Sequence, residues 1–449
     1  RRVLFRSMQR VMDEVCDGDL QNFKSNGPAY TRKNFFGKYP ETAKLVEDLS
    51  DEEINKLNRG GHDPYKIYAA FHHAINKNGG RPTVILAHTI KGYGFGEAGE
   101  AQNTAHSLKK LDIEQLKSFR DRFAVPLKDE ELKDVPYYRP APDSPEIVYM
   151  KKRRQELGGF YPKRRKDCQP LQIPDLDIFK AVLEGSGDRK ISTTMAFVRI
   201  LTALTKDKRI GKRVVPIVPD EARTFGMEGM FRQLGIYTAE GQKYVPEDRD
   251  QIMYYREDKK GQILEEGINE DGSMAAWMAA ATSYSTNNFP LIPFYIFYSM
   301  FGFQRVGDLA WASGDIQARG FLIGGTAGRT TLNGEGLQHQ DGHSHVLANT
   351  IPNCKAYDPA YGYEMAVVLR KGMKEMFEDN QNVFYYLTIE NENYEQPAMP
   401  KDCEDGIIKG MYKFESVETK GNKKTPRVQL LGAGAILNEV RAAAQMLKV

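Results

Sequence analysis

The chain has 449 residues, which at roughly 100 to 200 residues per domain corresponds to two to four domains. Hydrophobic residues make up 41% and charged residues 27%, a balance that excludes a disordered or fibrous protein. The 63 Lys and Arg against 60 Asp and Glu leave a net charge of +3, which argues against a whole-chain electrostatic hold on nucleic acid.

Membrane and disulfide chemistry are also disfavoured. The longest apolar stretch, residues 289–303, contains a proline and is shorter than the ~20 residues that a membrane span requires. The four cysteines lie far apart without a CxxC pair, so neither a disulfide framework nor a zinc ribbon is expected. A reducing cytoplasm is the predicted location.

Both ends are expected to be cut. Residues 1–7, RRVLFRS, precede a helical run from Met8 and have the look of a translated sequencing adaptor, so we predict that they are non-native. The final helix, residues 436–449, has no Gly or Asn terminator, and we expect the parent protein to continue.

The first part of the chain predicts a helix followed by a strand. Ser50 and Glu53 form a capping box, and Asp63 with Pro64 opens a second helix. Residues 82–89, PTVILAHT, then predict a buried strand, an order typical of a parallel sheet covered on both faces.

A glycine-rich loop and a linker separate this part from a second domain. The loop at 91–107 precedes a charged helix at 112–122, and the Pro-rich, basic tract 125–174 is the best linker candidate. The second domain is predicted to open with a helix at 193–204 and a strand at 214–218.

The remaining pattern alternates strands and helices, which predicts an α/β fold of parallel sheets flanked by helices. Further strands are expected at 291–298, 320–324, 383–389 and 428–432. The helices between them are expected at 272–285, 304–317 and 360–377.

Several residues are candidates for a site, each with a structural alternative. His339, His343 and His345 could hold a metal with Asp341, contact a substrate from a loop, or be purely structural. Glu270 precedes an apolar helix, either as a capping acid or as a buried carboxylate presented to a ligand.

Three further sequence patterns are best interpreted as structural rather than functional. The aromatic segment 294–305 is typical of core, although the carboxyl end of a parallel strand is also where flat ligands bind. The basic clusters 151–154 and 163–166 favour a solvated linker over a nucleic-acid patch. Gly432 and Gly434 match a dinucleotide loop only weakly, because Leu437 replaces its third glycine.

Taken together, the segments resemble a known family: the homodimeric, bacterial-type first component of pyruvate dehydrogenase, a thiamine-diphosphate enzyme of the transketolase superfamily. The similarity extends from Met8 to the last residue and is carried by blocks such as NRGGHDPYKIYAAF, ILAHTIKGYGFG, GQILEEGINE, PFYIFYSMFGFQRVGDL and GLQHQDGHSH. It implies part of a diphosphate-binding domain and linker at 8–169, a pyrimidine-binding domain at 170–399 and the start of a third domain at 400–449.

The resemblance also assigns roles to residues. It implies that Glu270 activates the cofactor through its pyrimidine ring, that Phe301 stacks on this ring and that Tyr298 lies close by. Lys91, His339 and Glu221 match residues that line the pyruvate pocket. His106 matches a loop histidine that serves acetyl transfer, and an imidazole suits proton transfer near neutral pH.

The implied activity is oxidative decarboxylation of pyruvate with reductive acetylation of the lipoyl domain of a partner acetyltransferase, by a homodimer that binds neither membrane nor nucleic acid. The superfamily's magnesium motif, a GDG followed by an Asn, does not occur in a suitable context. We expect it upstream, so this chain would hold half of a site for thiamine diphosphate and Mg²⁺ and would be inactive alone. The alternatives are another thiamine-dependent 2-oxo-acid dehydrogenase or a non-catalytic scaffold.

Overall fold

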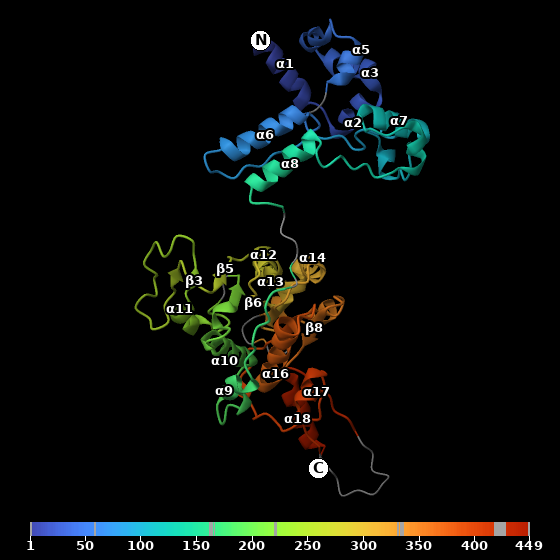
Figure 1. Cartoon of the computed structure of the whole chain (residues 1–449). Helices are drawn as coiled ribbons and strands as arrows, with labels where there is room; N and C mark the ends of the chain where they lie inside the picture. Colours follow the sequence, from blue (N-terminus) through green and yellow to red (C-terminus); the bar gives the residue numbers. More distant parts are fainter. Residues whose placement is uncertain are drawn as a thin grey trace. The chain divides into compact units, whose positions relative to one another are not determined.

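The computed structural model describes residues 2–57, 60–160, 165, 167–219, 222–329, 332, 336–416 and 428–447. The chain divides into two compact units, Arg1–Phe160 and Tyr161–Val449. Figure 1 shows that the first unit is built from helices and the second contains the strands. The predicted three-domain division stays a prediction.

The described part of the first unit is helical. Its α-helices are α1 (Arg2–Asp13), α2 (Asp17–Ser25), α3 (Gly27–Asn34), α4 (Pro40–Ala43), α5 (Asp51–Lys56), α6 (Pro64–Asn76), α7 (Ile113–Arg122) and α8 (Pro145–Glu156). The predicted capping box is confirmed, because the Ser50 hydroxyl accepts the Glu53 N–H and the Glu53 carboxylate accepts the Ser50 N–H. Asp63 caps α6 as predicted, accepting the N–H groups of Tyr65 and Lys66.

The predicted buried strand at 82–89 is wrong. These residues form no ladder, and Val84 and Leu86 are 84% and 91% exposed. A strand is stable only when neighbouring strands pair with its backbone groups, and the described residues of the first unit include no other strand. The apolar run is therefore exposed, and α6 beside it in sequence likewise has no buried side chain.

The predicted linker contains structure of its own. Helix α8 lies within the tract 125–174 and carries the basic cluster 151–154, whose side chains are mostly exposed. The division between the two units also falls inside this tract. Most of the second basic cluster, 163–166, lies outside the described residues.

The second unit is centred on a six-stranded sheet, and every neighbouring pair in it is parallel. The spatial order is β5 (Leu264–Glu265), β2 (Val214–Val218), β6 (Ile292–Tyr298), β7 (Phe321–Gly325), β9 (Phe384–Thr388) and β8 (Cys354–Tyr357). The strands predicted at 214–218, 291–298, 320–324 and 383–389 are confirmed to within one residue at each end. Strands β5 and β8 of this sheet were not predicted. Nor were the short pairs β1 (Lys190–Ile191) with β10 (Tyr394–Glu395) and β3 (Ile236–Tyr237) with β4 (Glu257–Asp258).

Helices cover both faces of this sheet. They are α9 (Lys180–Leu183), α10 (Thr193–Lys206), α11 (Glu228–Leu234), α12 (Glu270–Ala281), α13 (Ser283–Thr286), α14 (Gly302–Asp315), α15 (Ser344–Ala348) and α16 (Gly362–Met373). Successive β6 residues point to opposite faces: Phe294 packs in a core cluster with α10 and α16, and Tyr295 in a second cluster with α12 and α14. This is the predicted α/β arrangement, and it explains why the strands are apolar throughout.

The C-terminal part adds two helices, α17 (Glu404–Ile408) and α18 (Ile436–Met446). The backbone N–H of Ala435 donates to the Glu390 carboxylate at 3.2 Å, just before α18 begins. The strand predicted at 428–432 is wrong, because these residues pair with no described strand.

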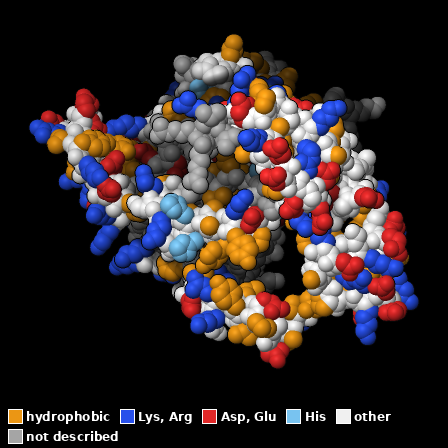
Figure 2. Space-filling model, turned by 90° about the horizontal axis from the view of Figure 1, so that it is seen from above, with side chains coloured by type: hydrophobic (Ala, Val, Ile, Leu, Met, Phe, Trp, Pro, Cys, Tyr) orange, Lys and Arg blue, Asp and Glu red, His pale blue; other side chains and the backbone are white. Residues whose placement is uncertain are grey.

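Charge is distributed without one dominant sign over the face seen in Figure 2, where hydrophobic side chains are exposed between acidic and basic ones. Across the described part of the chain, each helix is either too short or too polar to serve as a membrane span.

Candidate active site

Four of the predicted site residues gather at the carboxyl edge of the parallel sheet. Tyr298 is the last residue of β6 and lies opposite Gly325, the last residue of β7. Glu270 opens α12, which follows the edge strand β5, and His339 lies in the segment after β7. The carboxyl ends of parallel strands share one edge of a sheet, and ligands of open α/β folds bind there.

Glu270 is not the cap of its helix. That position belongs to Asn269, whose side-chain oxygen accepts the N–H of Gly272 at 3.0 Å. The cap position considered for Glu270 is therefore wrong, whereas the rest of that alternative, an acid attracted by the helix dipole, stays a prediction. The side chain of Glu270 is 13% exposed and lies in the first turn of α12, at the positive end of the helix dipole.

The aromatic rings of three predicted site residues lie together at this edge of the sheet. Tyr298 lies 4.6 Å from His339 and 5.9 Å from Phe301, measured between ring centres, and Phe301 lies 5.2 Å from His339. Phe301 ends the short helix η8 (Ser299–Phe301), and His339 ends η9 (Leu337–His339). The three rings provide flat aromatic walls of the kind that contact a planar ligand.

Arg305 is a site residue that the sequence analysis missed. It lies on α14 and forms an ion pair with Glu270, while its guanidinium carbon lies 4.4 Å from the centre of the Phe301 ring. Arg305 follows Phe301 by four residues and lies at the start of a predicted helix, and this spacing was the available signal. No sequence signal indicated its contact with Glu270, which is 35 residues away in sequence.

The histidine segment does not form the metal site that was considered. Asp341 instead accepts the N–H groups of His343 and Ser344, and the Ser344 hydroxyl, at the start of α15. Burial raises the pKa of the Asp341 carboxyl, but these hydrogen bonds outweigh burial and leave the pKa lowered. The His345 ring contacts the Thr388 hydroxyl at 2.9 Å, and no group of three metal-binding side chains occurs among the described residues.

The first unit contains two of the predicted site residues, Lys91 and His106, and brings their side chains together. The Nζ of Lys91 lies 3.3 Å from Nδ1 of His106, across the glycine-rich loop. The loop also closes on itself through its backbone, because the Ala101 N–H donates to the Lys91 carbonyl at 2.9 Å.

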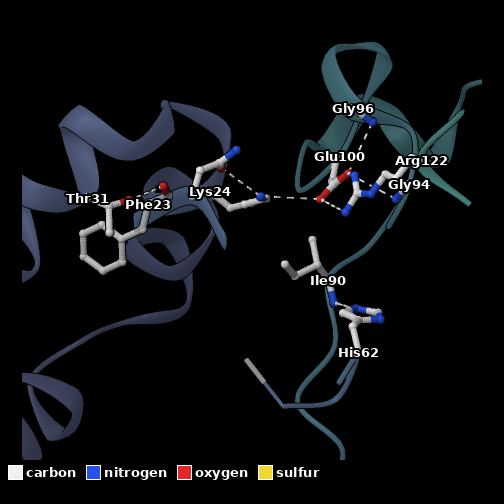
Figure 3. Close-up of polar contacts among 10 residues, drawn as sticks. Phe23, Lys24, Thr31, His62, Ile90, Gly94, Gly96, Glu100 and Arg122 are labelled. Carbon is white, nitrogen blue, oxygen red and sulfur yellow. Dashed lines mark hydrogen bonds and ion pairs between the residues drawn. The ribbon is translucent and has the colours of Figure 1, made fainter. Parts of the chain in front are cut away.

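Glu100, which was not predicted, organises this loop from within (Figure 3). Its buried carboxylate accepts the N–H of Gly94 at 3.1 Å and forms ion pairs with Arg122 and Lys24. Gly94 has a φ of +96°, and a side chain there would collide with the ring of Phe123. No sequence signal distinguished Glu100 from Glu97 in the same loop.

A stacked pair supports the segment that leads into the loop. The rings of His62 and Tyr93 stack at 3.8 Å with an interplanar angle of 5°. The Nε2 of His62 accepts the Ile90 N–H at 2.7 Å, so this imidazole is engaged in holding the backbone just before Lys91 (Figure 3).

The predicted site residues thus fall into two groups, one in each unit. Lys91 and His106 belong to the first unit, whereas Glu270, Phe301, Tyr298 and His339 belong to the second. Glu221 lies outside the described residues.

Known proteins match this chain over most of its length. The family model for the middle domain of the pyruvate dehydrogenase E1 component matches residues 171–397. The pyruvate dehydrogenase E1 component of Pseudomonas aeruginosa is 63% identical over 441 residues, 98% of this chain and 49% of that protein. That of Escherichia coli (strain K12) is 58% identical over 440 residues, with the same coverage of 98% and 49%. The chain therefore spans about half the length of these curated relatives.

Solved structures support the fold. Transketolase from Pichia stipitis, in complex with sedoheptulose 7-phosphate, matches 93% of this chain and 56% of that chain, with a TM-score of 0.54 and 14% identity. The predicted transketolase-like fold is thereby confirmed. By the match of the family model to half of its residues, the chain belongs to the pyruvate dehydrogenase E1 component middle domain family.

Proposed function

We propose that this chain belongs to a thiamine-diphosphate-dependent pyruvate dehydrogenase and carries the half of its site that binds the aminopyrimidine ring. The complete protein would decarboxylate pyruvate oxidatively and transfer the acetyl group to the lipoyl domain of a partner acetyltransferase. The observation that carries this proposal is the Glu270 carboxylate at the start of α12, which pairs with Arg305. The Arg305 guanidinium packs on Phe301, whose ring lies beside those of Tyr298 and His339.

The donor set of this site fits the proposed cofactor. A planar ring with nitrogen atoms needs flat walls and a group that exchanges a proton with a ring nitrogen, and the aromatic rings and Glu270 are groups of these two kinds. Only Oε1 of Glu270 has a hydrogen-bond partner among the described residues, which leaves Oε2 for a ligand. When bound, thiamine diphosphate supplies an acidic thiazolium carbon and an electron sink for decarboxylation.

Each residue has a role in this proposal. Phe301 and Tyr298 hold the ring and exclude water from it, and Glu270 Oε2 holds a proton at the ring nitrogen. His339 and Glu221 line the space for pyruvate, while the Lys91 ammonium attracts the pyruvate carboxylate. His106 serves acetyl transfer to the lipoyl arm by donating a hydrogen bond from Nε2.

The metal, the oligomeric state and the location are proposed from the family resemblance. We propose that Mg²⁺ neutralises the diphosphate, that the complete protein is a homodimer and that it works in the cytoplasm without membrane or nucleic-acid partners. The four cysteines are unpaired, which suits a reducing compartment.

The test uses the complete protein that contains this sequence, purified and supplied with thiamine diphosphate and Mg²⁺. Decarboxylation is measured with an artificial electron acceptor, for pyruvate and for 2-oxoglutarate in parallel. A preference for pyruvate is expected. Preference for 2-oxoglutarate would indicate another 2-oxo-acid dehydrogenase, and no cofactor binding at all would indicate a non-catalytic scaffold.

A further inference from the structure

His62 contacts the backbone directly before Lys91, the residue proposed to attract the pyruvate carboxylate. Its Nε2 accepts the Ile90 N–H at 2.7 Å (Figure 3). Its ring stacks on that of Tyr93, with 3.8 Å between the ring centres. His62 belongs to the turn before α6, so this turn and the start of the glycine-rich loop, which are distant in sequence, meet at one imidazole.

The turn that carries His62 is itself held in place. Asp63 caps α6, and its own N–H donates to the Gly60 carbonyl at 3.0 Å. A side chain at Gly61 would collide with the carbonyl group of His88, so the backbone of the turn packs directly against the end of the extended segment. The imidazole is therefore presented from a defined position.

Three hydrogen bonds hold the backbone around Lys91. The Ile90 carbonyl accepts the Tyr93 N–H at 3.3 Å, and the Lys91 carbonyl accepts the Ala101 N–H at 2.9 Å. Both of these donors belong to the glycine-rich loop itself. The third bond runs from the Ile90 N–H to His62, whose position lies outside the loop. This bond therefore ties the place of Lys91 to the start of α6.

We propose that His62 is a positioning residue that holds Lys91 where its ammonium receives the pyruvate carboxylate. This inference rests on the proposed function and deepens it, because it names the side chain that sets the position of Lys91. A lysine ammonium is a point charge on a flexible four-carbon stem, so a fixed backbone removes part of the freedom that binding would otherwise cost. The same ammonium lies 3.3 Å from Nδ1 of His106, and a shift of the backbone would disturb both groups.

The hydrogen bond assigns one chemical form to His62. A backbone N–H only donates, so Nε2 is the acceptor and the neutral imidazole carries its hydrogen on Nδ1. The ring also lies flat on Tyr93, at an interplanar angle of 5°, and the Arg122 guanidinium lies 4.6 Å from the centre of the same Tyr93 ring. His62 is thus an acceptor for Ile90 and a flat partner for Tyr93, and different substitutions remove each property.

The experiment compares His62→Phe, His62→Gln and His73→Phe in the complete protein, supplied with thiamine diphosphate and Mg²⁺. Phenylalanine keeps a flat ring but cannot accept the Ile90 N–H, whereas the side-chain oxygen of glutamine restores an acceptor. His73 is an exposed histidine on α6 and provides the matched control. Steady-state decarboxylation with an artificial electron acceptor gives KM for pyruvate and kcat separately.

We expect His62→Phe to raise KM for pyruvate about tenfold with little change in kcat, because binding of the carboxylate is what a displaced Lys91 loses. The Ile90 amide should also exchange faster with deuterium in this variant, as measured by mass spectrometry. His62→Gln should recover most of the parental KM, and His73→Phe should match the parent in every measurement.

A double-mutant cycle tests whether His62 acts through Lys91. If it does, His62→Phe added to Lys91→Met raises KM no further than Lys91→Met alone. Parental KM in His62→Phe, whatever its thermal stability, or full additivity in the cycle would overturn the inference while leaving the proposed function intact. An equal rise of KM in His62→Gln would overturn it as well, by assigning the effect to the ring instead of the hydrogen bond. Failure of the unmodified protein to decarboxylate pyruvate would instead refute the proposed function, and this inference with it.

Discussion

The side-chain ammonium of Lys91 lies 3.3 Å from Nδ1 of His106. An ammonium group only donates hydrogen bonds, so Nδ1 is the acceptor in this contact, and a neutral imidazole then carries its proton on Nε2. The contact therefore favours the tautomer in which Nε2 carries the hydrogen and can donate a hydrogen bond. This matches the role proposed for His106 in acetyl transfer.

The first prediction separates the two halves of the proposed reaction. His106→Ala in the complete protein should leave decarboxylation with an artificial electron acceptor largely intact and sharply reduce acetylation of the lipoyl domain. The reason is that only the second half needs the hydrogen bond that His106 donates from Nε2. Both rates are measured on the same preparation.

The control for this prediction is His72→Ala, an exposed histidine on α6 in the same unit, which should change neither rate. If His106→Ala lowered both rates equally, His106 would belong to the decarboxylation step. If it lowered neither, the residue would be an ordinary surface histidine.

The second prediction concerns the order of the glycine-rich loop. Glu100→Gln removes the buried charge that pairs with Arg122 and Lys24, and because both cations are partly exposed we expect the loop to lose about 1 kcal/mol of stability. Backbone amides of residues 92–106 should exchange with deuterium faster, as measured by mass spectrometry. The matched control, Glu97→Gln, alters an exposed glutamate of the same loop and should leave the exchange unchanged.

The same site gives the loop a defined dependence on pH. Burial raises the pKa of the Glu100 carboxyl, but Arg122 and the Gly94 N–H outweigh burial, and the pKa is lowered overall. A carboxyl whose pKa is lowered by folding stabilises the folded state when the pH is above the pKa of the unfolded chain. This stabilisation is lost as the pH falls through the pKa of the folded state. Protection of residues 92–106 should therefore decline below about pH 4 in the parent and much less in Glu100→Gln. Equal pH profiles would exclude Glu100 as the cause.

The third prediction is that this 449-residue chain is inactive alone and binds thiamine diphosphate weakly, even with Mg²⁺. Metal-bridged contacts with the diphosphate are expected to supply most of the affinity, and the described residues include no group of three side chains able to hold an ion. Calorimetric titration of the isolated chain measures this directly. Micromolar or tighter binding would show that the described half of the site suffices.

The sheet of the second unit was predictable because its signals are local. The strand at 214–218 was located to the residue, since a continuous apolar run between two turns leaves few alternatives. Residues 82–89 carry the same kind of run and form no strand. The difference is not local: β2 has β5 and β6 as neighbours, whereas 82–89 has no pairing strand among the described residues.

The site was predictable only in part, for a related reason. The resemblance supplied Glu270, Phe301, Tyr298 and His339, and these residues do lie at one edge of the sheet. Arg305 and Glu100 were missed because an ion pair is a relation between positions distant in sequence. The Arg305 partner is 35 residues away and the Arg122 partner of Glu100 is 22 residues away, so neither pair forms a recognisable motif.

The most direct test of the account is proton exchange at the thiazolium carbon of bound thiamine diphosphate, measured by quenched-flow hydrogen–deuterium exchange in the complete protein. Glu270→Gln fills the same space but is a poor proton partner for the ring nitrogen, so exchange should slow by roughly two orders of magnitude, about 3 kcal/mol. An unchanged exchange rate, with the cofactor still bound, would contradict the role of Glu270 on which the proposed function depends.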